Sequence, residues 1–285
     1  MNIWKFITGL LGVVGAALLG GALSSYAATP ATPAAIRSDT ETYYLLVFNQ
    51  PVAGQETEYN DWYDHQHAPD VVSVPGFVSA RRYVLAEYQL RPPTLIKPRY
   101  AVIYKIVTAD LSAVYAEVNR RIRSGETRMS RTLDMSSGEN YTYRVFRPRL
   151  MGSKPDNPEG AAGVLQDYVQ LVFADPADGL DAEFNNWYDR HHAPDVLTVP
   201  GFVSGQRLTL ADVQLVKQGT PQQYLTMFDI RSTDLKRTLA DFVMRAPGMS
   251  NSPAFDGKRV FGYTYRALGL PLDGDAIRAQ RAAGR

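Results

Sequence analysis

The chain has 285 residues, which is enough for two domains of roughly 100–150 residues each. Its formal net charge is +1 and no block of like charges occurs, so the sequence lacks the basic stripe that is typical of nucleic-acid binding. Cysteine is absent, which excludes disulfide bonds, thiolate metal ligands and a cysteine nucleophile.

The N-terminal segment has the layout of a secretory signal peptide. Lys5 precedes an apolar run from Phe6 to Leu23, and small residues up to Ala27 follow. This order predicts a signal peptide over residues 1–27 and a periplasmic or secreted mature protein that begins with a flexible lead-in over residues 28–40. The alternative is an uncut membrane anchor, because the apolar run of 18 residues just reaches spanning length.

Two segments of the chain are closely similar copies of one another. The segments Glu58–Arg82 and Glu183–Arg207, 125 positions apart, share 17 of 25 residues, and Tyr141–Arg144 matches Tyr263–Arg266. Similarity of this extent at a fixed spacing predicts a tandem duplication. The predicted order is a first α+β domain over residues 41–150, a linker over residues 151–166, a second α+β domain over residues 167–268 and a C-terminal tail over residues 269–285.

Both copies show the same order of predicted elements. In the first copy, strand-length apolar runs and helical periodicity alternate over Tyr43–Phe48, Gln55–Ala68, Phe77–Leu85, Tyr100–Val107, Asp110–Arg123 and Tyr141–Phe146. In the second copy, the same pattern covers Tyr168–Phe173, Asp181–Ala193, Phe202–Leu210, Tyr224–Ile230, Asp234–Arg245 and Arg259–Arg266. We expect Pro69 to end the first helix, because proline disfavours helical geometry in the residue before it. The order β-α-β-β-α-β predicts a ferredoxin-like unit with helices on one face of an antiparallel sheet.

The first strand of the first copy is apolar on both faces. Tyr43, Leu45 and Val47 point to one side of the strand, and the residues between them, which are also largely apolar, point to the other. A sheet with one face in water should alternate between apolar and polar residues. We therefore expect the sheet of the other copy to cover the second face, so that the two units pair within one chain.

The order of elements and the motif W-Y-D-x-x-H-x-P-D followed by V-P-G-F resemble the dimeric α+β barrel superfamily, and within it most resemble EthD-like domains. The resemblance covers Tyr43–Arg147 and Tyr168–Arg266. It implies that two sheets pair into a barrel and that each unit holds a pocket between its own sheet and helices. Members of this superfamily include cofactor-free cyclases, isomerases, dehydratases and monooxygenases that act on aromatic or polyketide-like molecules, while others bind haem. The fold alone therefore does not fix the reaction.

Two histidines at matched positions of the repeat, His67 and His192, are the candidate catalytic residues. Both share a helical stripe with aromatic residues, and histidine is a natural general acid or base because its pKa lies near working pH. Four aspartates, three residues before and after the histidines, are candidates for orienting the two imidazoles: Asp64, Asp70, Asp189 and Asp195. The alternative is that each histidine is a structural cap at a helix C-terminus.

Further matched pairs are candidate contacts to a substrate. They are Trp62 and Trp187, Tyr63 and Tyr188, Arg82 and Arg207, and Tyr143 and Tyr265. The tryptophans suit the core as well as a ligand platform, the arginines suit a solvated strand face as well as an anionic substrate, and the tyrosines can also fill the sheet. No metal site is expected, because the His65-x-His67 pattern is not reproduced in the second copy.

Three functions remain open from the sequence. The first is a cofactor-independent enzyme of the lyase, dehydratase or isomerase type, in which His67 and His192 transfer protons on a small hydrophobic or aromatic substrate. The second is a haem protein with a matched histidine as axial ligand. The third is a small-molecule binding module without catalysis. The expected assembly is a monomer with an internal pseudo-dimer or a homo-oligomer.

Overall fold

The computed structural model describes residues 40–90, 98–159, 161–217, 219 and 221–284. The predicted signal peptide lies outside these residues, as does the lead-in apart from its last position. Among the helices of the described part, none combines the length and the apolar character that crossing a membrane requires.

The elements follow the predicted order in both halves of the chain. The first half contains β1 (Glu41–Asn49), α1 (Glu56–Trp62), the π-helical turn η2 (Tyr63–His67), α2 (Ala68–Val72), β2 (Phe77–Leu85), β3 (Tyr100–Thr108), α3 (Leu111–Ser124), β4 (Glu139–Val145) and β5 (Leu150–Met151). The second half contains β6 (Gln166–Pro176), α4 (Asp181–Trp187), the π-helical turn η3 (Tyr188–His192), α5 (Ala193–Val196), β7 (Phe202–Leu210), β8 (Tyr224–Ser232), α6 (Leu235–Arg245), the 3₁₀ turn η4 (Ala246–Gly248), β9 (Phe255–Asp273) and α7 (Gly274–Ala283).

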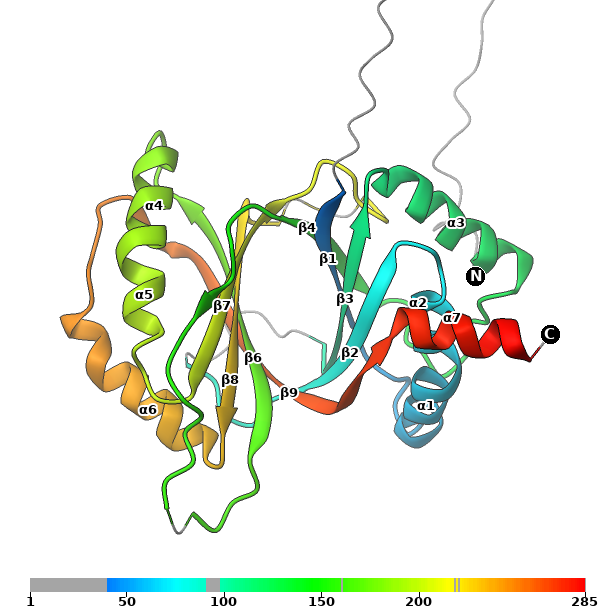
Figure 1. Cartoon of the computed structure of the whole chain (residues 1–285), viewed down its shortest axis with the longest axis horizontal. Coiled ribbons are helices and arrows are strands. Elements are labelled where there is room, and N and C mark those ends of the chain that lie inside the picture. The colour runs from blue at the N-terminus through cyan, green and yellow to red at the C-terminus, as the bar shows by residue number, and fades with distance from the viewer. Residues whose placement is uncertain (1–39, 91–97, 160, 218, 220, 285) are drawn as a thin grey trace, which may run out of the picture. The chain divides into compact units, whose positions relative to one another are not determined.

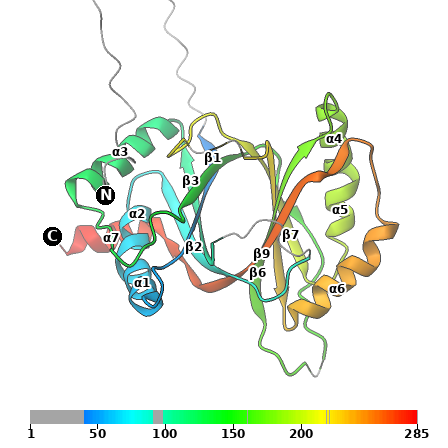
Figure 2. The ribbon, with the colours of Figure 1, turned by 180° about the vertical axis from the view of Figure 1, so that it is seen from behind.

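The strands form one antiparallel sheet that closes on itself. Its order is β4-β1-β3-β2-β9-β6-β8-β7-β5, and a further pairing of β4 with β7 completes the ring. The two seams between the halves are the β2–β9 pairing, which includes Val84 opposite Arg266, and the β4–β7 pairing, which includes Arg144 opposite Thr209. Figures 1 and 2 show the strands around a common centre, with the helices on the outside at both ends of the view. The fold is therefore an α+β barrel with no free edge at either seam.

Each strand has one face toward the interior of the barrel and one toward the helices. Phe48 and Phe173, from the first strand of each half, meet in the interior with ring centroids 6.4 Å apart. The opposite face of β1 contributes Leu45 to the core under α1 and α3, where Tyr59 and Val114 also lie. Both faces of the strand are thus buried, because strands of the other half cover the face that the helices leave open.

The helix of the motif does not end at Pro69, so this prediction is wrong. The backbone N–H of Ala68 donates to the carbonyl of Tyr63, five residues earlier, and α2 then continues to Val72. A proline inside an α-helix clashes with the carbonyl four residues before it. The wider π-turn accommodates the proline without breaking the helix. The second half repeats the arrangement.

Neither His67 nor His192 lies at a helix C-terminus, so a C-terminal cap does not account for them.

The C-terminal segment, expected only as a tail, is ordered structure. β9 continues to Asp273, opposite Ser79 of β2. Helix α7 then packs beside α2, where Arg278 donates to the carbonyls of Val72 (3.1 Å) and Phe77 (2.9 Å). The extension was missed because its pairing partner belongs to the other half of the chain.

Candidate functional site

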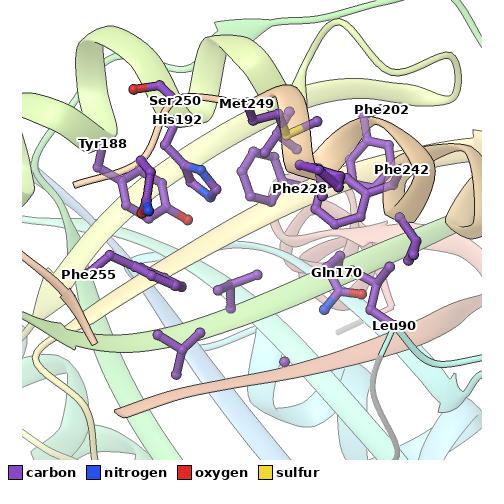
Figure 3. A pocket seen from close by; sticks show the side chains of 18 of the residues that line it. Leu90, Gln170, Tyr188, His192, Phe202, Phe228, Phe242, Met249, Ser250 and Phe255 are labelled. Atoms are coloured by element: carbon purple, nitrogen blue, oxygen red, sulfur yellow. The ribbon is translucent and has the colours of Figure 1, made fainter. Parts of the chain in front are cut away.

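The second half holds a cavity of about 540 Å³ between its sheet and its helices. The cavity is lined mainly by apolar and aromatic side chains, which come from β6, β7, β8 and β9, from α4, η3 and α5 of the motif helix, from α6 and the segment around η4, and from the segment after β2 (Figure 3). They are Leu90, Val172, Trp187, Tyr188, Val196, Phe202, Phe228, Phe242, Val243, Pro247, Met249, Phe255 and Val260. The remaining lining residues include His192, Gln170 and Ser250, and none of the described lining residues carries a formal charge at neutral pH. A cavity of this size and polarity suits a small, neutral, apolar molecule.

His192 points into this cavity (Figure 3). Its ring stacks on that of Trp187 with centroids 4.7 Å apart and meets the edge of Tyr188 at 4.8 Å. Within the described part of the chain, neither ring nitrogen of His192 has a hydrogen-bond partner. Burial lowers the pKa of His192 to about 4, while the charge of Asp195 opposes this shift. The imidazole is therefore neutral at pH 7, and one ring nitrogen offers a free lone pair to a molecule in the cavity.

The polar groups around His192 are donors or are already engaged. Burial raises the pKa of Tyr188, so its hydroxyl stays protonated at neutral pH. The hydroxyl of Ser250 accepts a hydrogen bond from Trp187 Nε1 at 3.1 Å. The Gln170 side chain is held by Thr264, whose hydroxyl donates to it. His192 is consequently the titratable base that the structure presents to this cavity.

The motif aspartates before the histidines bind arginines instead of imidazoles. Arg207, only 3% exposed, forms an ion pair with Asp189 and lies 4.3 Å above the ring of Tyr188. Arg82 pairs with Asp64 at 2.7 Å in the first half. A buried guanidinium requires such a partner, because an unpaired charge out of water is costly. These pairs fasten the motif helix to the neighbouring strand. The arginines do not line the cavity, so the structure does not place them as contacts to an anionic substrate there.

The aspartates after the histidines also have other partners. Asp70 accepts from Arg281 of α7 at 2.5 Å, and Asp195 accepts from the backbone N–H of Ser250 at 2.8 Å. No hydrogen bond joins any of the four motif aspartates to His67 or His192 within the described residues. Their effect on His67 and His192 is electrostatic, since Asp70 and Asp195 each oppose the lowering of the neighbouring histidine pKa.

Tyr143 and Tyr265 lie far from this chemistry, in the barrel interior. Tyr143 packs against Phe173 with ring centroids 6.0 Å apart, and Tyr265 against Phe48 at 5.9 Å. Their hydroxyls donate to backbone carbonyls. Neither tyrosine lines the cavity beside the helices, because side chains alternate between the two faces of a strand, and their positions agree with the alternative that they fill the sheet.

His67 occupies the corresponding place in the first half, in a more crowded setting. It stacks on Trp62 with centroids 4.6 Å apart, and burial lowers its pKa to about 4. Its Nδ1 is buried without a hydrogen-bond partner among the described residues. The strand positions of Phe228 and Gly262 are taken here by the larger Tyr104 and Asn140. The two halves therefore keep the same histidine but differ in the space beside it.

Sequence reasoning missed most of the cavity wall. The four phenylalanines at positions 202, 228, 242 and 255 come from four separate elements, and no motif joins them. Gly262 is the member with a local signal, since glycine inside a strand indicates space or a close approach. A Cβ at this position would meet Gln170 Nε2 at 2.8 Å.

Comparison with known proteins assigns neither a family nor an activity. No protein-family model matches the chain, and no curated protein matches it either. Solved structures with a related chain course include an anthrone oxidase-like protein (TM-score 0.45, 11% identity, covering 83% of this chain and 94% of that one). A putative monooxygenase from Fusobacterium nucleatum gives a TM-score of 0.44 at 8% identity, covering 83% and 99%. Chlorite dismutase from Candidatus Nitrospira defluvii gives 0.43 at 13% identity, covering 86% and 97%.

Proposed function

We propose that the chain is a tandem duplication of two ferredoxin-like βαββαβ units, closed within one polypeptide into the barrel that two subunits form in the dimeric α+β barrel superfamily, and that the units are EthD-like. The repeated motif supports the duplication. The equal strand orders support it independently: β4-β1-β3-β2 in the first half corresponds to β9-β6-β8-β7 in the second.

We propose that the cavity of the second half binds a small aromatic or similarly flat apolar molecule and that His192 transfers a proton on it. The observation that carries this proposal is a neutral imidazole without a partner that points into an apolar cavity. Phenyl rings on several sides favour a flat ligand through stacking and edge contacts.

The low pKa of His192 restricts the chemistry. Because its conjugate acid has a pKa of about 4, His192 is a weak base and can remove a proton only from a position that the substrate itself activates strongly, such as a carbon next to a conjugated carbonyl. The proton on His192 can return to another atom of the same molecule, which is an isomerisation, or leave with a departing hydroxyl as water, which is a dehydration. The Tyr188 hydroxyl can stabilise the negative charge that develops on a carbonyl oxygen. The reaction class is therefore lyase, dehydratase or isomerase.

Haem binding is the alternative function, and the residues that line the cavity do not fit haem. A histidine is present as an axial ligand. Haem also carries two propionate carboxylates, and the described lining of the cavity contains no cationic side chain to pair with them. Buried charges require partners. The absence of a Soret band after incubation of the purified protein with haemin is the expected result.

A matched set of variants tests the catalytic proposal and separates it from simple binding. Small molecules that co-purify with the protein are identified by mass spectrometry and offered as substrates. His192→Ala should lower turnover by about 10²–10⁴-fold while retaining binding. The control is His191→Ala, because His191 is exposed one position away. Full turnover in His192→Ala with intact folding would overturn the proposal. Binding by the wild type without turnover of any co-purified molecule would favour a non-catalytic binding module.

We also propose that the chain is exported and that the mature protein begins near Ala28, in the periplasm or outside the cell. The Lys5 and apolar-run layout supports this. N-terminal sequencing of the protein from an exporting host should find Ala28 or a neighbour. An intact Met1 in the membrane fraction would indicate an uncut anchor instead.

A further inference from the structure

A second cavity of about 650 Å³ lies where the end of β2 in the first half meets β6, β9 and α6 of the second half. Tyr168 of β6 and Arg266 of β9 are partners in the sheet, and both line this cavity. Other walls come from the end of β2 and the start of α6, with Val84, Leu85 and Leu235 as apolar members. The two cavities share no lining residue.

The corresponding place in the first half contains a carboxylate. Tyr43 and Arg144 are the equivalent pair of sheet partners. The hydroxyl of Tyr43 donates to Glu41 at 2.6 Å, and Arg144 Nη1 lies 3.1 Å from the other oxygen of the same carboxylate. The phenol and the guanidinium therefore bind the two oxygens of one carboxylate.

The second half retains the tyrosine and the arginine as donors but has no carboxylate at the position of Glu41. The position of Glu41 is taken by Gln166. Within the described part of the chain, no hydrogen bond or ion pair engages the guanidinium of Arg266 or the hydroxyl of Tyr168. Arg266 is half-buried, and burial raises the pKa of Tyr168. Both groups are thus donors at neutral pH, and neither is hydrogen-bonded to a carboxylate among the described residues; Asp234, which also lines the cavity, acts on Tyr168 only through its charge.

The other charged side chains that line this cavity have partners of their own or are exposed to solvent. Arg99 pairs with Glu56 at 3.2 Å and Arg237 with Asp156 at 2.9 Å. Asp234 caps α6, where it accepts from the backbone N–H of Arg237 at 3.0 Å. The last acid of the lining, Glu87, is exposed to solvent. A partly desolvated cation without a partner is unfavourable, so the second half gains most from an anion that supplies the missing oxygens.

We propose that this cavity binds a small carboxylate-bearing molecule, and that its carboxylate lies between Tyr168 and Arg266 as Glu41 does between Tyr43 and Arg144. The apolar side chains at the end of β2 and the start of α6 contact the hydrocarbon part of the ligand. The proposal does not depend on the function of His192.

Isothermal titration of the full chain with butyrate at pH 7, at constant ionic strength, tests the site. The wild type should bind butyrate, and its neutral isostere butyramide should bind at least about tenfold more weakly, because a hydrogen bond to a charged group is worth more than a neutral one. Arg266→Gln should weaken butyrate binding by about tenfold or more. Gln166→Glu retains the arginine and restores the internal carboxylate of the first half, so it should abolish binding by occupying both donors.

Arg144→Gln is the matched control and should bind butyrate as the wild type does, because Arg144 is already neutralised by Glu41. Thermal unfolding of each variant verifies that it is folded. The proposal is overturned if the wild type does not bind butyrate, if Arg266→Gln binds it with unchanged affinity, or if butyramide binds equally well. Unchanged binding in a folded Gln166→Glu variant would contradict the position assigned to the carboxylate.

Discussion

The rings of Trp187 and His192 stack with centroids 4.7 Å apart and an angle of 27° between their planes, although the two residues are five positions apart in the chain. In a regular α-helix, residues three and four apart share a face, and residues five apart do not. The π-helical turn η3 changes this relationship, because its backbone hydrogen bonds join residues five apart. Trp62 and His67 repeat the arrangement in the first half. The turn therefore determines which direction each histidine faces.

The two buried histidines should make the stability of the protein depend on pH. Each has a pKa of about 4 in the folded state, against an ordinary value near 6.5. Between these values the unfolded chain binds more protons, so stability is full above about pH 6.5 and falls as the pH is lowered toward 4. Urea unfolding from pH 7 to pH 4.5 should show this loss, and His67→Ala and His192→Ala should each reduce its size. An identical pH dependence in the variants would contradict the assigned burial.

Asp189→Asn should lower the free energy of unfolding, and its effect should not be limited to the surroundings of His192. The substitution leaves the Arg207 guanidinium, which is 3% exposed, without its charged partner. Removing one member of a buried pair costs about 3 kcal/mol or more, as measured by urea unfolding. The control is Asp178→Asn, because Asp178 is 87% exposed in its pair with Arg259 and should contribute less than about 1 kcal/mol. Equal effects of the two substitutions would disagree with the structure.

Gly262→Asn should close the cavity beside His192. The first half has Asn140 at this position, and a Cβ on Gly262 would meet the amide of Gln170, which lines the same cavity, at 2.8 Å. Overfilling a packed space costs about 1–3 kcal/mol, so ligand binding should weaken by about tenfold or more. Gly257→Asn lies on the same strand at an exposed position and should leave binding unchanged. Wild-type affinity in Gly262→Asn would show that the ligand lies elsewhere.

The first half expressed alone, as residues 38–150, should not be a stable monomer. Without the second half, the edges of β2 and β4 lose their partners β9 and β7. The interior side chains Leu46 and Phe48 would also be exposed. Unpaired strand edges and large apolar patches promote association. Size-exclusion chromatography with light scattering should show a dimer or aggregate for the half chain, with residues 38–285 as the reference. A soluble monomeric half would contradict the pairing.

The sequence by itself determined the local elements and the identity of the motif residues. The start of the helix expected over Asp110–Arg123 is confirmed, since Asp110 caps α3 by accepting from the N–H of Ala113 at 2.9 Å. Periodicity gave the strands of each half to within a few residues, apart from β9, which continues to Asp273, and the short β5, because alternation along a strand is a property of neighbouring positions. The apolar second face of β1 likewise predicted that something covers it.

Tertiary structure decided which partner each polar side chain takes. Asp189 lies three residues from His192 in the sequence, yet it binds Arg207 of the next strand, because a buried guanidinium has the stronger requirement for a carboxylate. Position along the chain shows only which groups are within reach. Closure of the barrel determines which face of each strand is buried in the interior, which cavity remains beside His192 and which strand the C-terminal part of β9 pairs with. Each of these results from contacts between residues far apart in the sequence.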